Sequence, residues 1–157
     1  MENELNALVE KLHLQAHPEG GYYSETYRST ERIASQNRAL VTSIYFLLTS
    51  ENVSKFHRIK SDEIWFFHAG SPLIVHTLDQ FGHHENRVGL DLENGENPQF
   101  LVPKDTIFGS SVLNDNSYSL VSCVVAPGFD FEDFELFTKA DLLPLFPEHE
   151  AIISRLT

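Results

Sequence analysis

Two side chains that can move protons or bind a metal, His57 and Glu63, stand close together near the middle of the chain. Residues 54–70 predict two short strands joined by a polar turn, with His57 on the first strand, Glu63 at the start of the second and Gly70 at the end of the hairpin. Pairing of these strands would bring an imidazole beside a carboxylate. Such a pair is typical of either a divalent-metal site or a general acid–base site.

A metal site needs more ligands than this pair supplies. A catalytic divalent metal generally takes about three protein ligands and keeps one position open. Strand alternation turns His68 away from the face that carries Glu63, so His68 would reach the site only through a β-bulge. His76 on the following strand is another candidate for the third ligand. We therefore expect no metal and no other cofactor, and keep a metal-dependent oxygenase or isomerase as an alternative.

Proton transfer requires only the residues already present. A neutral His57 could take a proton from a carbon next to a carbonyl group while Glu63 fixes its tautomer. A phenol from Tyr22, Tyr45 or Tyr118 could return a proton on the opposite side. This arrangement predicts an epimerase or isomerase of a sugar-like or other oxygenated small molecule. The alternative is a hydrogen-bonded strand histidine in a protein that binds a small molecule without catalysis.

Several other residues are candidates for binding the ligand or an ion. Trp65 and Phe67 share the face of Glu63 and predict an aromatic wall of a pocket. Arg28 could bind a carboxylate or phosphate, although alternation places it and Glu25 on opposite faces of the strand over residues 22–28. The polar cluster at residues 83–85, His-His-Glu, is more typical of a solvated segment beside a turn than of a metal site.

The remaining elements predict an all-β protein with helices only at its ends. Leu5, Leu8, Val9 and Leu12 recur at helical spacing and predict a helix over residues 3–14. Near-continuous hydrophobicity over residues 40–48 predicts a strand that is buried on both sides or lies at a subunit interface. A loop is expected over residues 30–38. Further strands are predicted over residues 72–78, 83–90, 99–102, from 106, over 118–126 and, with a bend, over 129–137.

The C-terminal residues predict two short helices. Thr138 with Asp141 forms a near capping box, and Pro147 can open a second helix that ends near Leu156. Strands of this length with turns at regular intervals are typical of a β-sandwich or barrel. No repeat, low-complexity tract or linker divides the chain, so we expect one domain over residues 1–157.

Composition limits the partners. The 157 residues include 41% hydrophobic and 22% charged residues, which is typical of a globular domain. The formal net charge of −12 would repel phosphate backbones and anionic lipids, so we expect no nucleic-acid or membrane partner. Neither a signal sequence nor a long apolar run is evident, which predicts a cytoplasmic protein. Cys123 is the single cysteine and is expected to be a small core residue on a buried strand.

The central stretch resembles the first conserved motif of the cupin superfamily, in which two His, a Glu and a Gly recur at fixed spacing. His57, Ile59, Glu63 and Gly70 occupy those places, and residues 102–108 resemble an eroded second motif that ends at Phe108. Three further segments resemble a cupin branch known as a domain of unknown function: residues 17–23 (HPEGGYY), 61–65 (SDEIW) and 126–131 (APGFDF).

This resemblance covers residues 5–137 and implies a jelly-roll barrel with a ligand pocket inside it. It also implies a homodimer, structurally akin to dTDP-4-dehydrorhamnose 3,5-epimerases and plant seed storage proteins. It does not imply a specific reaction. Two departures matter, because Ile59 and Phe108 stand where the metal-binding pattern has histidines. The candidate catalytic residues are His57, Glu63, Tyr45 and Tyr118, and the candidate ligand-binding residues are Trp65, Phe67, His76, Arg28 and Phe108.

Overall fold

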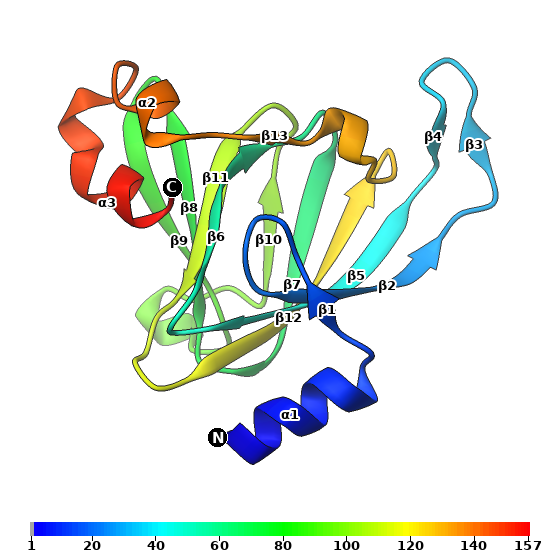
Figure 1. Cartoon of the computed structure of the whole chain (residues 1–157), viewed down its shortest axis with the longest axis horizontal. Helices are drawn as coiled ribbons and strands as arrows, with labels where there is room; N and C mark the ends of the chain where they lie inside the picture. The colour runs from blue at the N-terminus through cyan, green and yellow to red at the C-terminus, as the bar shows by residue number, and fades with distance from the viewer. Residues whose placement is uncertain (1) are drawn as a thin grey trace.

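Two antiparallel sheets face one another and form a barrel with its helices packed outside (Figure 1). A computed structural model describes residues 2–157. The six-stranded sheet contains, in spatial order, β1 (Gln15–Ala16), β2 (Tyr22–Arg28), β5 (Thr42–Thr49), β12 (Tyr118–Ala126), β7 (Asp62–Gly70) and β10 (Gln99–Val102). The five-stranded sheet contains β13 (Glu135–Leu136), β6 (Val53–Arg58), β11 (Ile107–Val112), β8 (Leu73–Asp79) and β9 (Gly82–Val88). This is the predicted jelly-roll fold.

The helices lie at the two ends of the chain, as predicted. α1 covers Glu2–Lys11 and ends before the predicted residue 14, because His13 takes a left-handed backbone conformation with φ of 53°. The C-terminal helices are α2 (Lys139–Leu142) and α3 (Glu150–Arg155). Thr138 caps α2 with the predicted capping box to Asp141. Among residues 2–157, every helix is too short or too polar to cross a bilayer.

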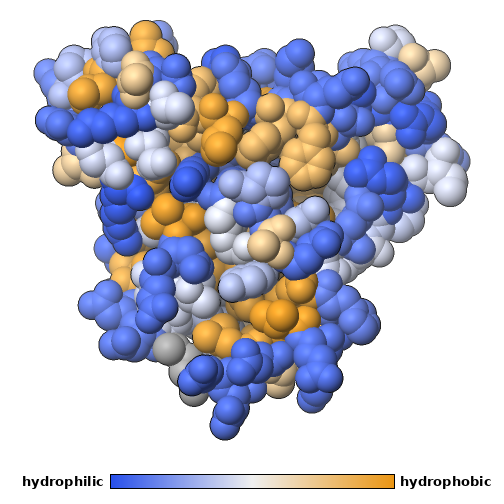
Figure 2. Space-filling view, viewed as in Figure 1, coloured by the Kyte–Doolittle hydropathy of each residue, from blue (hydrophilic) through white to orange (hydrophobic). Residues whose placement is uncertain are grey.

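The strand β5 is buried on both faces, as its hydrophobicity predicted. Phe46 and Leu48 point into the barrel core, whereas Tyr45 and Leu47 pack beneath α1 on the outer face. The covering helix therefore accounts for the apolar run without a second subunit. In Figure 2, apolar side chains gather between α1 and the barrel, while polar residues cover the outlying hairpin of β3 (Arg32–Ile33) and β4 (Arg38–Ala39). The homodimer stays a prediction.

Two sequence expectations about loops and strands were wrong. The segment over residues 30–38, expected to be a loop, contains the β3–β4 hairpin. The strand expected over residues 129–137 is a 3₁₀ turn at Phe131–Asp133 followed by the two-residue β13. Asp130 caps this turn by accepting a hydrogen bond from the backbone N–H of Glu132 at 2.9 Å. Phe129, Phe131 and Phe134 of this segment pack against one another, and only Glu135 and Leu136 pair with a sheet strand.

Candidate functional site

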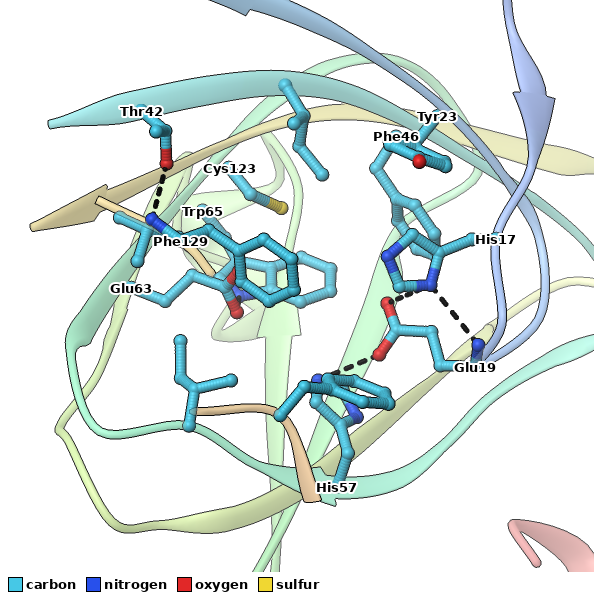
Figure 3. Close-up of a pocket in the computed structure, with 14 residues that line it drawn as sticks. His17, Glu19, Tyr23, Thr42, Phe46, His57, Glu63, Trp65, Cys123 and Phe129 are labelled. Atoms are coloured by element: carbon cyan, nitrogen blue, oxygen red, sulfur yellow. Dashed lines mark hydrogen bonds and ion pairs between the residues drawn. The ribbon is translucent and has the colours of Figure 1, made fainter. Parts of the chain in front are cut away.

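A cavity lies inside the barrel, where the turn between β1 and β2 meets β6, β7 and the segment after β12 (Figure 3). It encloses about 500 Å³ of empty space including its mouth, but only about 40 Å³ is available to the centre of a water molecule. The enclosed part of the cavity therefore has room for only a small ligand. Its walls are His17, Glu19, Tyr23, Thr42, Ile44, Phe46, His57, Ile59, Glu63, Trp65, Cys123, Val125, Phe129 and Phe134.

His57 on β6 forms a buried ion pair with Glu19. Its Nε2 lies 2.7 Å from Glu19 Oε2, and its Nδ1 lies 2.7 Å from the backbone oxygen of Lys55. Because both ring nitrogens face acceptors, this geometry favours the imidazolium. Burial lowers the pKa of His57, but the charge of Glu19 and the contacts to Glu19 and Lys55 outweigh burial and raise it. The sequence-based expectation that His57 is neutral is therefore wrong.

Glu19 is one of the cavity residues that sequence reasoning missed. It is 6% exposed, and burial alone would raise its pKa, but the charge and proximity of His57 lower the pKa overall. Its Oε2 lies 2.7 Å from His57 Nε2, so the two groups form a close ion pair inside the barrel. The HPEGGYY segment contained the relevant signal, a carboxylate before a glycine pair, although nothing in that spacing connects it to His57.

Gly20 lets the turn approach β6 closely enough to place Glu19. The backbone N–H of Lys55 donates to the carbonyl oxygen of Glu19 at 2.7 Å. Gly20 has a φ of +111°, and a Cβ there would lie 2.0 Å from the backbone oxygen of Val53. Only glycine satisfies both constraints.

We expect Gly20→Ala to lower the free energy of unfolding by more than the roughly 1–3 kcal/mol of a strained backbone conformation. The Cβ would also collide with Val53, and this adds to the loss. Gly95→Ala is a matched control, because Gly95 also has a positive φ of 79° but has nothing within 4 Å of the added Cβ. Urea unfolding measures both variants, and equal losses would contradict the proposed role of close approach.

Glu63 extends into the same cavity from β7 but does not pair with His57. Its Oε2 accepts a hydrogen bond from Trp65 Nε1 at 3.0 Å. Burial raises the pKa of Glu63 to about 7, with the negative charge of Glu19 adding to the effect and the charge of His57 opposing it. The expectation that Glu63 orients His57 is therefore wrong. Glu63 is instead a carboxyl group that exchanges a proton near neutral pH.

His17 adds a neutral imidazole to the cavity. Burial lowers its pKa, and the opposing effect of Glu19 is smaller. Its Nδ1 accepts a hydrogen bond from the backbone N–H of Glu19 at 3.2 Å, which leaves the proton of the neutral ring on Nε2. The second ring nitrogen faces the interior of the cavity in Figure 3. His17 can therefore donate a hydrogen bond to an oxygen atom of a ligand.

The cavity also contains a phenol and a thiol. Tyr23, rather than any of the three tyrosines named from the sequence, is the tyrosine in its wall. Tyr45 packs beneath α1, and Tyr118 donates to Glu4 Oε1 at 2.6 Å on the same outer face. Cys123 is buried, as expected, and burial raises the pKa of its thiol well above the usual value. Cys123 is therefore a neutral wall residue and not a nucleophile.

The other candidates from the sequence are divided between the cavity and the surrounding structure. Trp65 lines the cavity, as expected, but Phe67 packs at the edge of the core cluster outside it. Phe108 lies behind His57, with ring centroids 4.2 Å apart. His68 points outward and its Nε2 contacts the hydroxyl of Ser122, which agrees with strand alternation. A β-bulge at this position of β7 does not turn His68 into the barrel.

His76 lies on the opposite side of the five-stranded sheet from the cavity. Its neighbours on β8, Leu73 and Val75, belong to the barrel core, whereas Leu78 packs against the C-terminal helices. His76 Nδ1 is 2.9 Å from His83 Nε2. Burial lowers the pKa of His76 to about 3, and the charges of His83 and Arg155 add to this effect. His76 cannot contact a ligand in the barrel.

Arg28 stands at the mouth of the cavity. A β-bulge between Glu25 and Tyr27 reverses the alternation of β2, so Arg28 and Glu25 share a face and form an ion pair at 2.7 Å. Both residues line a groove that shares Tyr23 and Phe129 with the barrel cavity. The expectation that Arg28 and Glu25 lie on opposite faces is corrected by this bulge.

The residues at the cupin metal positions do not fit a bound metal. Ile59 and Phe108 carry no donor atoms, and both ring nitrogens of His57 already contact acceptors. His17, Glu19 and Glu63 add donors to the cavity. In the part of the chain that the structure describes, these donors do not converge closely enough to share one ion with His57. We therefore derive no step through a metal in the barrel.

Comparison with known proteins decides the family. A model of the cupin superfamily domain of unknown function DUF985 matches residues 6–137. The chain belongs to this family. An uncharacterized protein of Saccharomyces cerevisiae is 32% identical over 158 aligned residues, which cover 90% of this chain and 79% of the yeast protein. The earlier resemblance to this cupin branch is therefore confirmed, but the family does not carry an assigned activity.

Solved structures agree with this assignment. A hypothetical protein from Leishmania major has a TM-score of 0.90 at 43% identity and covers 97% of both chains. A protein from Shewanella oneidensis has a TM-score of 0.92 at 46% identity, with 97% of this chain and 96% of that chain covered. Oxalate decarboxylase of Bacillus subtilis has a TM-score of 0.60 at 18% identity and is covered over only 38% of its length. This last likeness concerns the fold alone.

Proposed function

We propose that this cupin-family protein binds a small oxygenated, sugar-like metabolite in its barrel and moves a proton on it, as an epimerase or isomerase. The proposal depends on one observation: Glu63 is a buried carboxyl group in the cavity, and burial raises its pKa to about 7. A group with a pKa near the working pH serves as both proton acceptor and donor. The fixed charges of Glu19 and His57 lie beside it in the same cavity.

The reaction assigns a role to each polar group. The carboxylate of Glu63 takes a proton from a carbon next to a ligand carbonyl, and the electrons of the broken C–H bond move to the carbonyl oxygen. His17 Nε2–H donates to that oxygen, and the imidazolium of His57 stabilises its negative charge through space. In an isomerisation, the proton of the hydroxyl on the first carbon moves to the enediolate oxygen, and Glu63 returns its proton to the former carbonyl carbon while the new carbonyl forms. In an epimerisation, Tyr23 gives a proton to the opposite face of the same carbon and the carbonyl re-forms, after which Glu63 releases its proton to solvent and Tyr23 recovers one.

The direct test is proton exchange in deuterated water. We would incubate the protein with a panel of hydroxy-ketone and keto-sugar compounds and follow carbon-bound deuterium by NMR and mass spectrometry. The proposal predicts enzyme-dependent deuterium at a carbon next to a carbonyl group. A compound that binds the barrel but never exchanges such a proton would instead favour a non-catalytic binding protein.

We infer that the ligand carries an anionic group, which Arg28 would bind in competition with its present partner Glu25. The groove that holds Arg28 adjoins the barrel cavity, so a ligand with its reacting carbons near Glu63 can extend a carboxylate or phosphate to the guanidinium. Arg28 Nη2 already donates to the backbone oxygen of Phe129 at 3.1 Å, which holds the side chain at this mouth.

We expect Arg28→Met to weaken binding of an anionic ligand roughly tenfold to hundredfold, the usual range for a lost hydrogen bond to a charged group. Binding of a neutral analogue should be unchanged. Arg32→Met is the matched control, because Arg32 lies on the outlying β3–β4 hairpin and contacts Asn37 there. Calorimetric titration measures the affinities. An equal loss for anionic and neutral ligands would contradict this role.

A further inference from the structure

Three potential metal ligands converge on the outer face of the five-stranded sheet, far from the residues of the barrel cavity. They are His76 on β8 with His83 and Glu85 on β9, and their ligand atoms lie within 4.8 Å of one another. His76 pairs directly with Glu85 in the sheet register, and His83 stands two residues before Glu85 on the same face. The backbone pairing of two strands therefore fixes this cluster.

The cluster has the ligand composition of a zinc site. Two imidazoles and one carboxylate form a common protein ligand set for Zn²⁺, with the fourth position left for water or another ligand. The rings of His76 and His83 are nearly parallel, with an interplanar angle of 19°. His76 Nδ1 and His83 Nε2 are 2.9 Å apart. Tetrahedral zinc with Zn–N bonds of about 2.0–2.1 Å requires about 3.3 Å between them, so a shift of roughly 0.4 Å would admit the ion.

Ser111 contacts the nitrogen of His76 that does not face His83. Its buried hydroxyl lies 2.9 Å from His76 Nε2, on the side of the ring away from His83. A hydrogen bond from Nε2–H to this hydroxyl leaves Nδ1 as the lone-pair atom that faces His83 and Glu85. His83 would then carry its proton on Nδ1 and use Nε2 as a ligand. This is the tautomer of the buried histidine that metal binding requires.

We propose that His76, His83 and Glu85 form a binding site for a borderline divalent cation of the Zn²⁺ class, separate from the barrel. Glu85 is exposed and His83 is half-buried, so an ion can enter from solvent without unfolding the sheet. The site also adjoins the C-terminal segment, because the rings of His83 and His149 lie 6.0 Å apart. An ion there would stabilise the pairing of β8 and β9 at the edge of the sheet, close to that segment.

The test is a Zn²⁺ titration of protein from which any affinity tag has been removed, followed with a competing chelator dye. We expect one equivalent to bind. His83→Ala and Glu85→Gln should weaken binding by more than the roughly 10–100-fold that loss of an outer-shell partner costs, and Ser111→Ala should fall within that range. Substitution with Co²⁺ gives an independent readout, since the visible spectrum of the bound ion should lose its tetrahedral bands in His83→Ala.

Two control variants distinguish this site from others in the chain. His84→Ala removes the neighbouring imidazole, which points the other way and contacts Asp79 at 3.1 Å. Glu63→Gln removes a carboxylate from the barrel. Both should bind Zn²⁺ like the unaltered protein. Absence of stoichiometric binding, unchanged affinity in both His83→Ala and Glu85→Gln, or a comparable loss in either control would overturn the proposal.

Discussion

Replacing Glu63 with glutamine should abolish proton exchange on the ligand while making the protein more stable at neutral and alkaline pH. General acid–base catalysis contributes typically about 10²–10⁴-fold to a rate, so Glu63→Gln should lower deuterium incorporation by that factor. Ligand affinity should change little, because glutamine keeps an oxygen that can accept the hydrogen bond from Trp65. Incorporation rates at saturating ligand measure the effect.

The gain in stability follows from the direction of the pKa shift. The folded chain holds the proton of Glu63 up to about pH 7, whereas the unfolded chain loses it near the ordinary carboxyl pKa of 4.5. Stability of the unaltered protein therefore falls as pH rises from 4.5 to 7 and levels off above it. The difference corresponds to about 3 kcal/mol. Glutamine removes this cost, so Glu63→Gln should gain most of that amount at pH 8 and almost nothing at pH 4.

Urea unfolding at the two pH values checks the stability, and carbon NMR of the Glu63 carboxyl group should show a midpoint near 7. Glu148→Gln provides the control, because Glu148 is exposed on the turn before α3. Retained exchange in Glu63→Gln would remove Glu63 from the mechanism. A loss of exchange without the gain at pH 8 would mean that Glu63 is already ionised in the folded protein.

Replacing Glu19 with glutamine should destabilise the protein strongly and more at pH 5.5 than at pH 8. Removing one partner of a buried ion pair typically costs about 3–5 kcal/mol, because the other partner must either stay charged without compensation or give up its charge. Burial alone lowers the pKa of His57, so without Glu19 its ring should lose its proton in the folded state. At pH 5.5 the unfolded chain keeps that proton, and this difference adds to the cost. At pH 8 the unfolded imidazole is neutral too.

The pH range of the ion pair follows from the shifts of its two partners. The lowered pKa of Glu19 stabilises the folded protein above 4.5, and this contribution is lost as pH falls through the folded value. The raised pKa of His57 stabilises it below 6.5, and this contribution is lost as pH rises through the folded value. Both contributions are complete between about pH 4.5 and 6.5, so pH 5.5 is where Glu19→Gln should cost most.

Glu96→Gln is the matched control for Glu19→Gln. Glu96 is another buried glutamate, 8% exposed, and accepts a hydrogen bond from the backbone N–H of Asp91 at 2.8 Å, but it lies outside the cavity. We expect it to lose about 1 kcal/mol with little dependence on pH. Chemical unfolding of both variants at pH 5.5 and 8 gives the comparison. Equal losses at the two pH values in Glu19→Gln would contradict a charged His57.

The sequence by itself determined the barrel and one wall of its cavity. Alternation along β7 correctly placed Trp65 beside Glu63 and turned His68 away, because side-chain direction in a strand repeats every two residues. The cupin motif identified the family. The apolar run in β5 predicted burial on both faces, and the capping box of Thr138 and Asp141 predicted a helix from a few neighbouring residues. Each of these conclusions depends on the types and the spacing of residues that are close together in the sequence.

Only the tertiary structure decided which groups share the cavity and in which protonation state. Glu19 is remote from His57 in sequence and reaches it through the turn at Gly20, which local spacing cannot predict. Tyr45 and Tyr118 pack beneath α1 and therefore do not line the cavity. A single bulge in β2 places Arg28 on the same face as Glu25. Burial then set the pKa values, because the cost of a charge depends on the groups that surround it in space. The geometry favours a charged His57 and leaves Glu63 as the carboxyl group with a pKa of about 7, whereas the sequence predicted His57 as the base and Glu63 as its orienting partner.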